Sequence, residues 1–269
     1  MVIKQLTQIF FSPTGTTRKV LSAIAEGINA DEIKGYDLTP PDKRDNFQLT
    51  LKKEDEIVLL GVPVYEEHVP DLLWDALNNI EASGQSIILV AVYGNIGFGM
   101  SLKELEAWAK RVGFHVVGAA AFIGEHSFSH KGLPLAENRP DVDDMKEARE
   151  FGKTLLAKLE NDVPLSLYIP GRLPLMGRIL QKNSSKFFAH YPEADMKKCT
   201  RCMRCLNACP SGAIDLGTLK IDHSVCLHCF ACVRVCAPGA RKIELKLKSF
   251  VRTFLQAQTK TRKFPELFL

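Results

Sequence analysis

The stretch FSPTGTTRKV (residues 11–20) marks a change from strand to helix. Residues 2–11 alternate like a β-strand, and residues 17–28 place their large apolar side chains on one helical face. Between them lies a short run of small and hydroxyl-bearing residues around Gly15. A strand–loop–helix junction presents backbone N–H groups and a helix N-terminus to an anion. The stretch therefore predicts an anion-binding loop at the edge of a sheet.

The side chains of this loop suit a phosphate group. Ser12, Thr14, Thr16 and Thr17 carry hydroxyls that can donate to phosphate oxygens, and Gly15 lets the backbone approach closely. The loop has neither the G-x-x-x-x-G-K-[ST] pattern of a P-loop nor the G-x-G-x-x-G pattern of a dinucleotide site. The plain structural alternative is a hydroxyl-rich helix cap without a ligand.

Strands and helices alternate through the rest of the first 160 residues. Apolar runs predict further strands at 32–38, 54–65, 86–94 and 115–124. Helical patterns predict helices at 70–80, 101–111 and 142–159, the second starting at a capping box formed by Ser101 and Glu104. This alternation predicts an α/β fold, with a doubly wound, five-stranded parallel sheet in the order 2-1-3-4-5.

Composition and charge indicate two soluble units. The hydrophobic content of 46% and the charged content of 25% are ordinary for a globular protein. The net charge of +4 conceals an acidic first part, residues 1–164, and a basic remainder. The basic part contains no recognisable nucleic-acid-reading module, so we expect no nucleic-acid partner. The first residues do not resemble a signal peptide and no run predicts a stable membrane span, so we expect a cytoplasmic protein.

All eight cysteines lie between residues 199 and 236. They form two C-x2-C-x2-C-x3-C runs, the first followed by Pro210 and the second by Ala237 and Pro238. In a cytosolic chain such spacing indicates metal binding rather than disulfides. Two zinc sites are the alternative, but zinc sites favour C-x2-C pairs separated by longer loops.

The two cysteine runs resemble those of bacterial-type ferredoxins with two [4Fe–4S] clusters, a small α+β fold. In that family the fourth cysteine of each run binds the other cluster. The resemblance thus implies two ligand sets: Cys199, Cys202, Cys205 and Cys236 for one cluster, and Cys226, Cys229, Cys232 and Cys209 for the other. His228 stands between two of these ligands, and we expect no metal role for it because the cysteine set is complete.

The loop at residues 12–17 looks like the FMN-phosphate loop of flavodoxins. In flavodoxin-like proteins, loops after the third and fourth strands hold the flavin ring; here these are residues 63–68 and 93–99, with residues 124–128 following the fifth strand. The resemblance implies an FMN site formed by Ser12, Thr14, Gly15, Thr16, Thr17, Pro63, Val64, Tyr65, Tyr93, Gly94, Asn95, Phe98, Gly99, Glu125 and His126.

Taken together, the two halves resemble flavodoxin–ferredoxin fusion proteins, the EFR1-type ferredoxins. We expect a flavodoxin-like domain at 1–162, a packed connector at 163–196, a ferredoxin domain at 197–244 and a helical extension at 245–269. The proline-spaced, apolar composition of the connector indicates a fixed arrangement of the domains rather than a free linker.

Joining a flavin to iron–sulfur clusters predicts an electron-transfer protein. We expect electrons to pass between the two [4Fe–4S] clusters and FMN, to or from a redox protein at the level of ferredoxin. In a second hypothesis an FMN-dependent oxidoreductase reduces a small acceptor such as a quinone or oxygen, with His68, His126 and Tyr65 as proton donors. A redox or oxygen sensor is a third, and a homodimer is left open.

Overall fold

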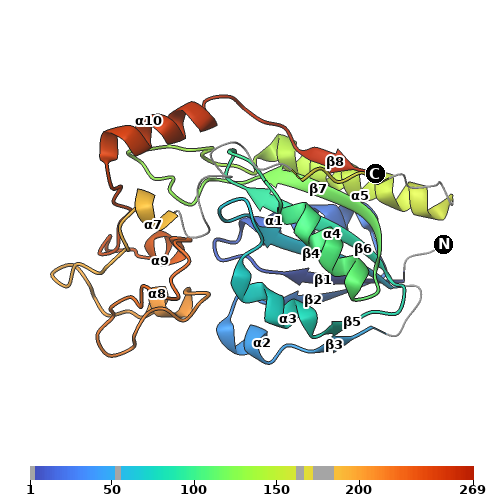
Figure 1. Cartoon of the computed structure of the whole chain (residues 1–269), viewed down its shortest axis with the longest axis horizontal. Helices are drawn as coiled ribbons and strands as arrows, with labels where there is room; N and C mark the ends of the chain where they lie inside the picture. The colour runs from blue at the N-terminus through green and yellow to red at the C-terminus, as the bar shows by residue number, and fades with distance from the viewer. Residues whose placement is uncertain (1–3, 52–55, 162–166, 172–184) are drawn as a thin grey trace.

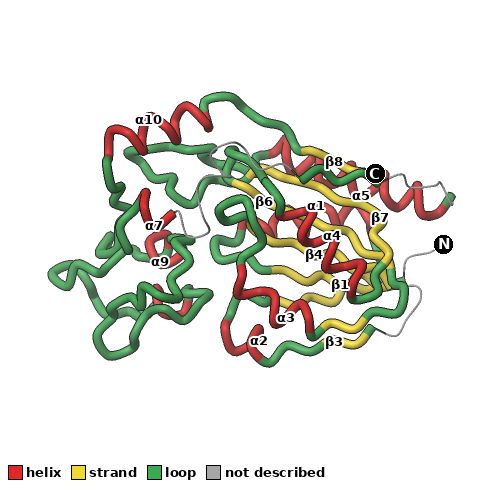
Figure 2. The backbone as a smooth tube through the Cα atoms, in the orientation of Figure 1, coloured by secondary structure: helices red, strands yellow, loops and turns green. Residues whose placement is uncertain are grey.

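The computed structural model describes residues 4–51, 56–161, 167–171 and 185–269. A sheet-based α/β part carries the first half of the chain, and the cysteine-rich part, mostly loop, lies beside one edge of it (Figures 1 and 2). Parts of two predicted strands, at 2–3 and 54–55, and half of the predicted connector fall outside the described residues.

A six-stranded sheet forms the centre of the first part. The strands stand in the order β2-β1-β4-β6-β7-β8, and neighbours among the first five run parallel. Their bounds are β1 Gln5–Phe10, β2 Glu32–Asp37, β4 Glu56–Pro63, β6 Ser86–Tyr93, β7 His115–Ile123 and β8 Glu266–Phe268. The predicted order 2-1-3-4-5 is confirmed for the five parallel strands.

Apolar side chains cover both faces of this sheet. Strand β4 is buried from Glu56 to Val62, as expected for a central strand between two helical layers. One core cluster includes Trp108 of α4 (Ser101–Arg111), and the other includes Phe151 of α5 (Val142–Glu160). The sheet is therefore doubly wound, with α1 (Thr16–Ile28) packed against α5 on one face.

Helix α1 lies very close to the sheet because β4 carries a glycine beneath it. A Cβ atom at Gly61 would come within 2.2 Å of the Leu21 side chain of α1. The missing side chain lets α1 approach the strand, and this fixes the position of the loop at its N-terminus.

Several short elements differ from the predictions. The predicted helix at 70–80 is a 3₁₀ turn, η1 (Asp71–Leu73), followed by α3 (Trp74–Asn78). After α3 the chain forms β5 (Ile80–Glu81), which pairs in parallel with β3 (Leu49–Thr50) in a separate small sheet. A short helix, α2 (Pro41–Asp45), precedes β3. A strand of two residues is too short for an alternating pattern, so β3 and β5 could not be predicted from the sequence.

The predicted capping box at Ser101 and Glu104 is wrong. Helix α4 is preceded by Met100, and the Ser101 hydroxyl donates to the Phe98 carbonyl at 2.7 Å. The Glu104 carboxylate instead lies 2.5 Å from His68 Nδ1 and accepts from the backbone N–H of Val69 at 3.0 Å. Both side chains therefore bond to residues outside the helix and do not cap its N-terminus. A reciprocal capping box is found at α5, with Asp141 as the N-cap.

The cysteine-rich part contains little regular structure. Its helices α8 (Arg204–Asn207) and α9 (Ala231–Arg234) are single turns, and an isolated bridge joins Ile214 to Ile221. A short helix, α7 (Ser185–Phe188), precedes this part. Helix α10 (Lys248–Thr259) follows it and leads back toward the sheet (Figure 1).

A helical extension was predicted at 245–269, but only part of this C-terminal segment is helical. Its last residues form β8, which pairs antiparallel with β7 through residues 266–268. This pairing covers part of an edge strand whose backbone groups would otherwise lack partners. Among the helices that the structure describes, none has the length and apolarity needed to cross a membrane.

Candidate functional site

A cavity of about 360 Å³ lies where the carboxyl ends of β1, β4, β6 and β7 meet the cysteine-rich part. In doubly wound folds this edge of the sheet is the usual ligand site. Both parts of the chain contribute to its wall, which we call the interdomain cavity. The first part supplies residues of four loops: Pro13, Thr14, Thr16, Thr17, Pro63, Val64, Tyr65, Glu66, Glu67, Val92, Tyr93, Gly94, Ile96, Gly97, Gly124, Glu125, His126, Ser127 and Phe128.

The loop at residues 12–17 forms one end of the cavity. Gly15 has a φ of +79° and directly precedes α1, and its N–H donates to the Ser12 carbonyl at 3.0 Å. This tight turn leads directly into α1. The hydroxyl oxygens of Thr14 in the turn and Thr16 at the start of the helix lie 3.1 Å apart. Two hydroxyls beside a helix N-terminus form a suitable site for an anion.

Most of the predicted flavin-site residues line the cavity. They are Thr14, Thr16, Thr17, Pro63, Val64, Tyr65, Tyr93, Gly94, Glu125 and His126. Five predicted residues are not part of the wall: Ser12, Gly15, Asn95, Phe98 and Gly99.

These five residues have structural roles next to the cavity. Gly15 makes the turn described above, and the Ser12 hydroxyl accepts from the Arg18 N–H at 3.1 Å, which turns it toward α1. Phe98 packs edge-on against Tyr93, with ring centroids 5.9 Å apart. Asn95 donates to the backbone carbonyl of Thr261 at 3.0 Å.

Gly99 is needed for close packing of two loops. Its φ is +53°, and a Cβ atom there would lie 2.5 Å from the carbonyl oxygen of Glu67. The turn thus brings the loop after β6 against the loop after β4. His68, a predicted proton donor, is not part of the cavity wall either, because Glu104 holds it.

The sequence did not predict the wall residues from the second half of the chain. They are Ser185, Phe188, Leu227, His228, Phe254, Leu255 and Gln258. These residues come from α7, from the second cysteine run and from α10. No local pattern marks them, because their position depends on how the two parts pack together.

Burial shifts the pKa values of the titratable rings in the wall in the direction that favours their uncharged forms. It raises the pKa of Tyr65 well above its usual value, with a further contribution from nearby Cys229, and it raises that of Tyr93 to about 12. Burial, followed by the charge of Arg234, lowers the pKa of His126 to about 4. At neutral pH the cavity therefore presents neutral aromatic side chains, which favour a planar, partly apolar ligand.

Two wall residues have buried polar atoms without a hydrogen-bond partner among the described residues. These atoms are Oε2 of Glu67 and both ring nitrogens of His228. Buried polar groups in proteins are nearly always paired. The cavity therefore fits a ligand that carries both hydrogen-bond donors and acceptors.

Two smaller cavities are lined by the cysteines. One is formed around Cys199, Cys202, Cys205 and Cys236, and the other around Cys209, Cys226, Cys229 and Cys232. The fourth cysteine of each run thus lies with the first three of the other run, the arrangement implied by the resemblance to bacterial ferredoxins. Backbone N–H groups point at the sulfurs, for example that of Ala213 at 3.3 Å from Cys209 Sγ.

The two cysteine cavities differ in their distance from the interdomain cavity. Leu227 and His228 line both the interdomain cavity and the cavity of Cys226, which we call proximal. The other, the distal cavity, shares no wall residue with the interdomain cavity. It includes Cys202, which is exposed, whereas Cys229 and Cys232 are buried.

Direct contacts hold the cysteine-rich part against the sheet edge. Arg234 of α9 forms an ion pair with Glu125 at 3.1 Å and donates to the His126 carbonyl at 3.2 Å. The rings of Phe128 and Phe230 meet edge to face, 5.2 Å between centroids. The two parts are therefore in fixed contact at the loop after β7.

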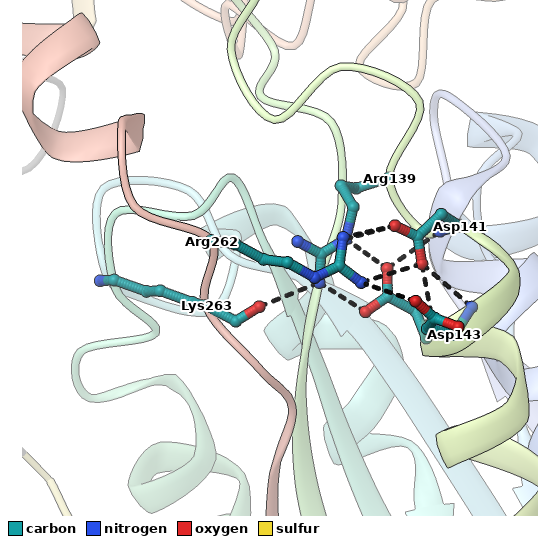
Figure 3. Close-up of polar contacts among 6 residues, drawn as sticks. Arg139, Asp141, Asp143, Arg262 and Lys263 are labelled. Atoms are coloured by element: carbon teal, nitrogen blue, oxygen red, sulfur yellow. Dashed lines mark hydrogen bonds and ion pairs between the residues drawn. The ribbon is translucent and has the colours of Figure 1, made fainter.

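The C-terminal strap, residues 259–268, continues from α10, which supplies Phe254, Leu255 and Gln258 to the cavity wall. Asn95 holds its start, and Lys263 Nζ donates to the Ile96 carbonyl at 2.6 Å. Figure 3 shows its middle, where Arg262 forms an ion pair with Asp141 at 2.6 Å and Arg139 donates to the Lys263 carbonyl at 3.1 Å. Together with β8, these contacts anchor α10 at the cavity.

Comparisons with known proteins agree with this division of the chain. A family model described as a 4Fe–4S dicluster domain matches residues 191–237. An uncharacterized protein of Methanocaldococcus jannaschii is 28% identical over 146 residues, which cover 52% of this chain and 89% of that protein. The dicluster match assigns two 4Fe–4S clusters to the eight cysteines, in place of the zinc alternative.

Flavodoxins are among the similar solved structures. A mutant flavodoxin of Fusobacterium nucleatum bound to flavin mononucleotide is 19% identical, with a TM-score of 0.39 over 60% of this chain and 97% of that one. A flavodoxin of Streptococcus pneumonia is 13% identical, with a TM-score of 0.41 over 57% and 99%. The strand order, rather than these likenesses, identifies the first part as flavodoxin-like.

Replacing Arg262 with Ala should loosen the C-terminal strap. The variant loses the ion pair with Asp141, so residues near the exposed Phe264 should be cut sooner by a protease that cleaves after aromatic residues. Arg252→Ala removes an exposed cation from α10 and serves as control. Equal cleavage rates in the two variants would show that the ion pair does not anchor the strap.

Replacing Cys209 with Ala should damage the proximal cluster more than the distal one. Although Cys209 belongs to the first run, it lines the cavity of Cys226, Cys229 and Cys232. Iron and sulfide analysis, together with the electron paramagnetic resonance of the reduced protein, distinguishes the clusters. Cys236→Ala is the matched variant and should give the opposite pattern. Selective loss of the distal cluster in Cys209→Ala would contradict the crossed arrangement.

Proposed function

We propose that this flavodoxin–ferredoxin fusion relays electrons between its two 4Fe–4S clusters and an FMN held in the interdomain cavity, to or from a redox protein partner. The observation that carries the proposal is the shared wall: Leu227 and His228 border both the proximal cysteine cavity and the interdomain cavity. FMN can exchange one or two electrons, and a 4Fe–4S cluster exchanges one.

The residues of the interdomain cavity fit FMN. Its volume of about 360 Å³ lies in the usual range of small-ligand sites. Thr14, Thr16 and the N-terminus of α1 would hold the phosphate. Neutral Tyr65 and Tyr93 provide aromatic walls for a flat ring, and Glu67 and His228 offer unpaired polar atoms to its edges.

Two features of the wall bear on the second hypothesis, an enzyme that reduces a small acceptor. Phe254 and Leu255 of α10 line one part of the cavity, and contacts of the C-terminal strap hold this helix in place. Of the three suggested proton donors, His68 is held outside the wall by Glu104. The absence of this donor from the wall favours electron transfer over turnover of a small substrate.

The distal cluster is our proposed contact with the partner. Cys202 is exposed, so this end of the cysteine-rich part is nearest to solvent. Electron exchange falls steeply with distance, and a redox protein would therefore approach most closely here. The order we propose is partner, distal cluster, proximal cluster and FMN.

Replacing Thr14 with Val should weaken FMN binding by roughly 1–3 kcal/mol, because a charged phosphate loses a hydrogen-bond donor. Titration of the apoprotein with FMN, followed by flavin fluorescence, measures the change. Thr154→Val, which removes a hydroxyl on the exposed face of α5, is the control. Unchanged affinity in Thr14→Val would mean that the phosphate binds elsewhere.

The relay itself is tested by the kinetics of flavin reduction. After rapid reduction of the clusters by flash photolysis, the flavin absorbance should bleach at a rate independent of protein concentration, since both parts belong to one chain and are in direct contact. Mass analysis of the released cofactor should identify FMN. A rate that rises in proportion to concentration would indicate transfer between molecules and contradict the proposed relay.

A further inference from the structure

His228 occupies an unusual position between the two kinds of cofactor site. It lies in the turn between Cys226 and Cys229, has a φ of 51° and is 2% exposed. The residue lines both the interdomain cavity and the proximal cysteine cavity.

The surroundings of His228 offer its ring no polar partner among the described residues. Tyr191 and Phe230 meet the imidazole with their rings, at centroid distances of 4.5 and 5.6 Å. The Tyr191 hydroxyl is directed to the carbonyl of His223, at 3.2 Å. Both imidazole nitrogens are buried, and neither has a hydrogen-bond partner in the part of the chain that the structure describes. A side chain that only filled space here would be apolar, since a buried polar atom without a partner is destabilising.

An imidazole retains at least one N–H in either tautomer. We propose that the His228 ring donates this hydrogen bond to a polar edge of the FMN in the interdomain cavity. His228 is then a positioning residue, which ties the flavin to the loop that carries two ligands of the proximal cluster. This assignment rests on the proposed function and extends it to one side chain.

The second unpaired group of the wall agrees with this assignment. The Oε2 atom of Glu67 is also buried and borders the same cavity. A carboxylate accepts hydrogen bonds, whereas the imidazole N–H donates. The flavin ring carries carbonyl oxygens and an N–H group, so a single ligand can satisfy both residues.

The test compares two substitutions of similar size, His228→Gln and His228→Met. Glutamine keeps an N–H donor, whereas methionine removes it. Neither side chain is branched at Cβ, so the positive φ at this position strains both alike. The FMN dissociation constant of each protein, measured by flavin fluorescence at equal iron content, is the readout.

We expect His228→Met to bind FMN roughly five- to tenfold more weakly than the wild type, and His228→Gln to recover part of the loss. The same pair of substitutions at His223, an exposed histidine that stacks on Tyr191, should leave the affinity unchanged. This control separates the donor from general effects on the cysteine-rich part.

Equal affinities for His228→Gln and His228→Met, or tighter binding by His228→Met, would overturn the assignment. Unchanged FMN affinity with a shifted reduction potential of the clusters would also overturn it, because the hydrogen bond would then belong to the proximal cluster. These outcomes leave the relay intact. Failure of the wild-type protein to bind FMN would instead contradict the proposed function.

Discussion

The arrangement of the sites depends on the contact between the loop after β7 and helix α9. Arg234 reaches Glu125 and the carbonyl of His126, and beside it Phe128 packs on Phe230. The apolar pair contributes most of the free energy expected from such a contact, since a partly exposed ion pair adds little. The ion pair sets the orientation. Without this contact, Leu227 and His228 would not reach the interdomain cavity.

The uneven charge of the chain is consistent with this contact. Arginines of the basic second part meet carboxylates of the acidic first part in two places, Arg234 with Glu125 and Arg262 with Asp141. Glu125 lines the cavity, whereas Arg262 belongs to the C-terminal strap. Long-range attraction between the parts would be screened by salt, but these direct contacts specify how they meet.

The sequence predicted what depends on local pattern. Buried apolar runs predicted the parallel strands, and the resemblance of the cysteine runs to those of bacterial ferredoxins implied the crossed grouping that places Cys209 with Cys226. It could not predict that Phe254 and His228 line one cavity, because they meet only through packing between distant segments. For the same reason the sequence could not show that the side chains of Phe98 and Asn95 contact Tyr93 and the Thr261 carbonyl beside the cavity, because these contacts depend on tertiary neighbours.

The crossed cysteines also bear on how the second part reaches its folded state. This part has two single-turn helices and one isolated bridge around a small apolar cluster, which is little to offset the loss of chain entropy. A cluster bound by Cys209 and Cys226 would link the first cysteine run to the second, as a covalent cross-link would. A cluster bound by Cys205 and Cys236 would do the same. Cluster insertion and chain folding are thus coupled, and the first cluster to form preorganises a ligand for the second. Maturation of this segment should be cooperative, with half-assembled molecules scarce.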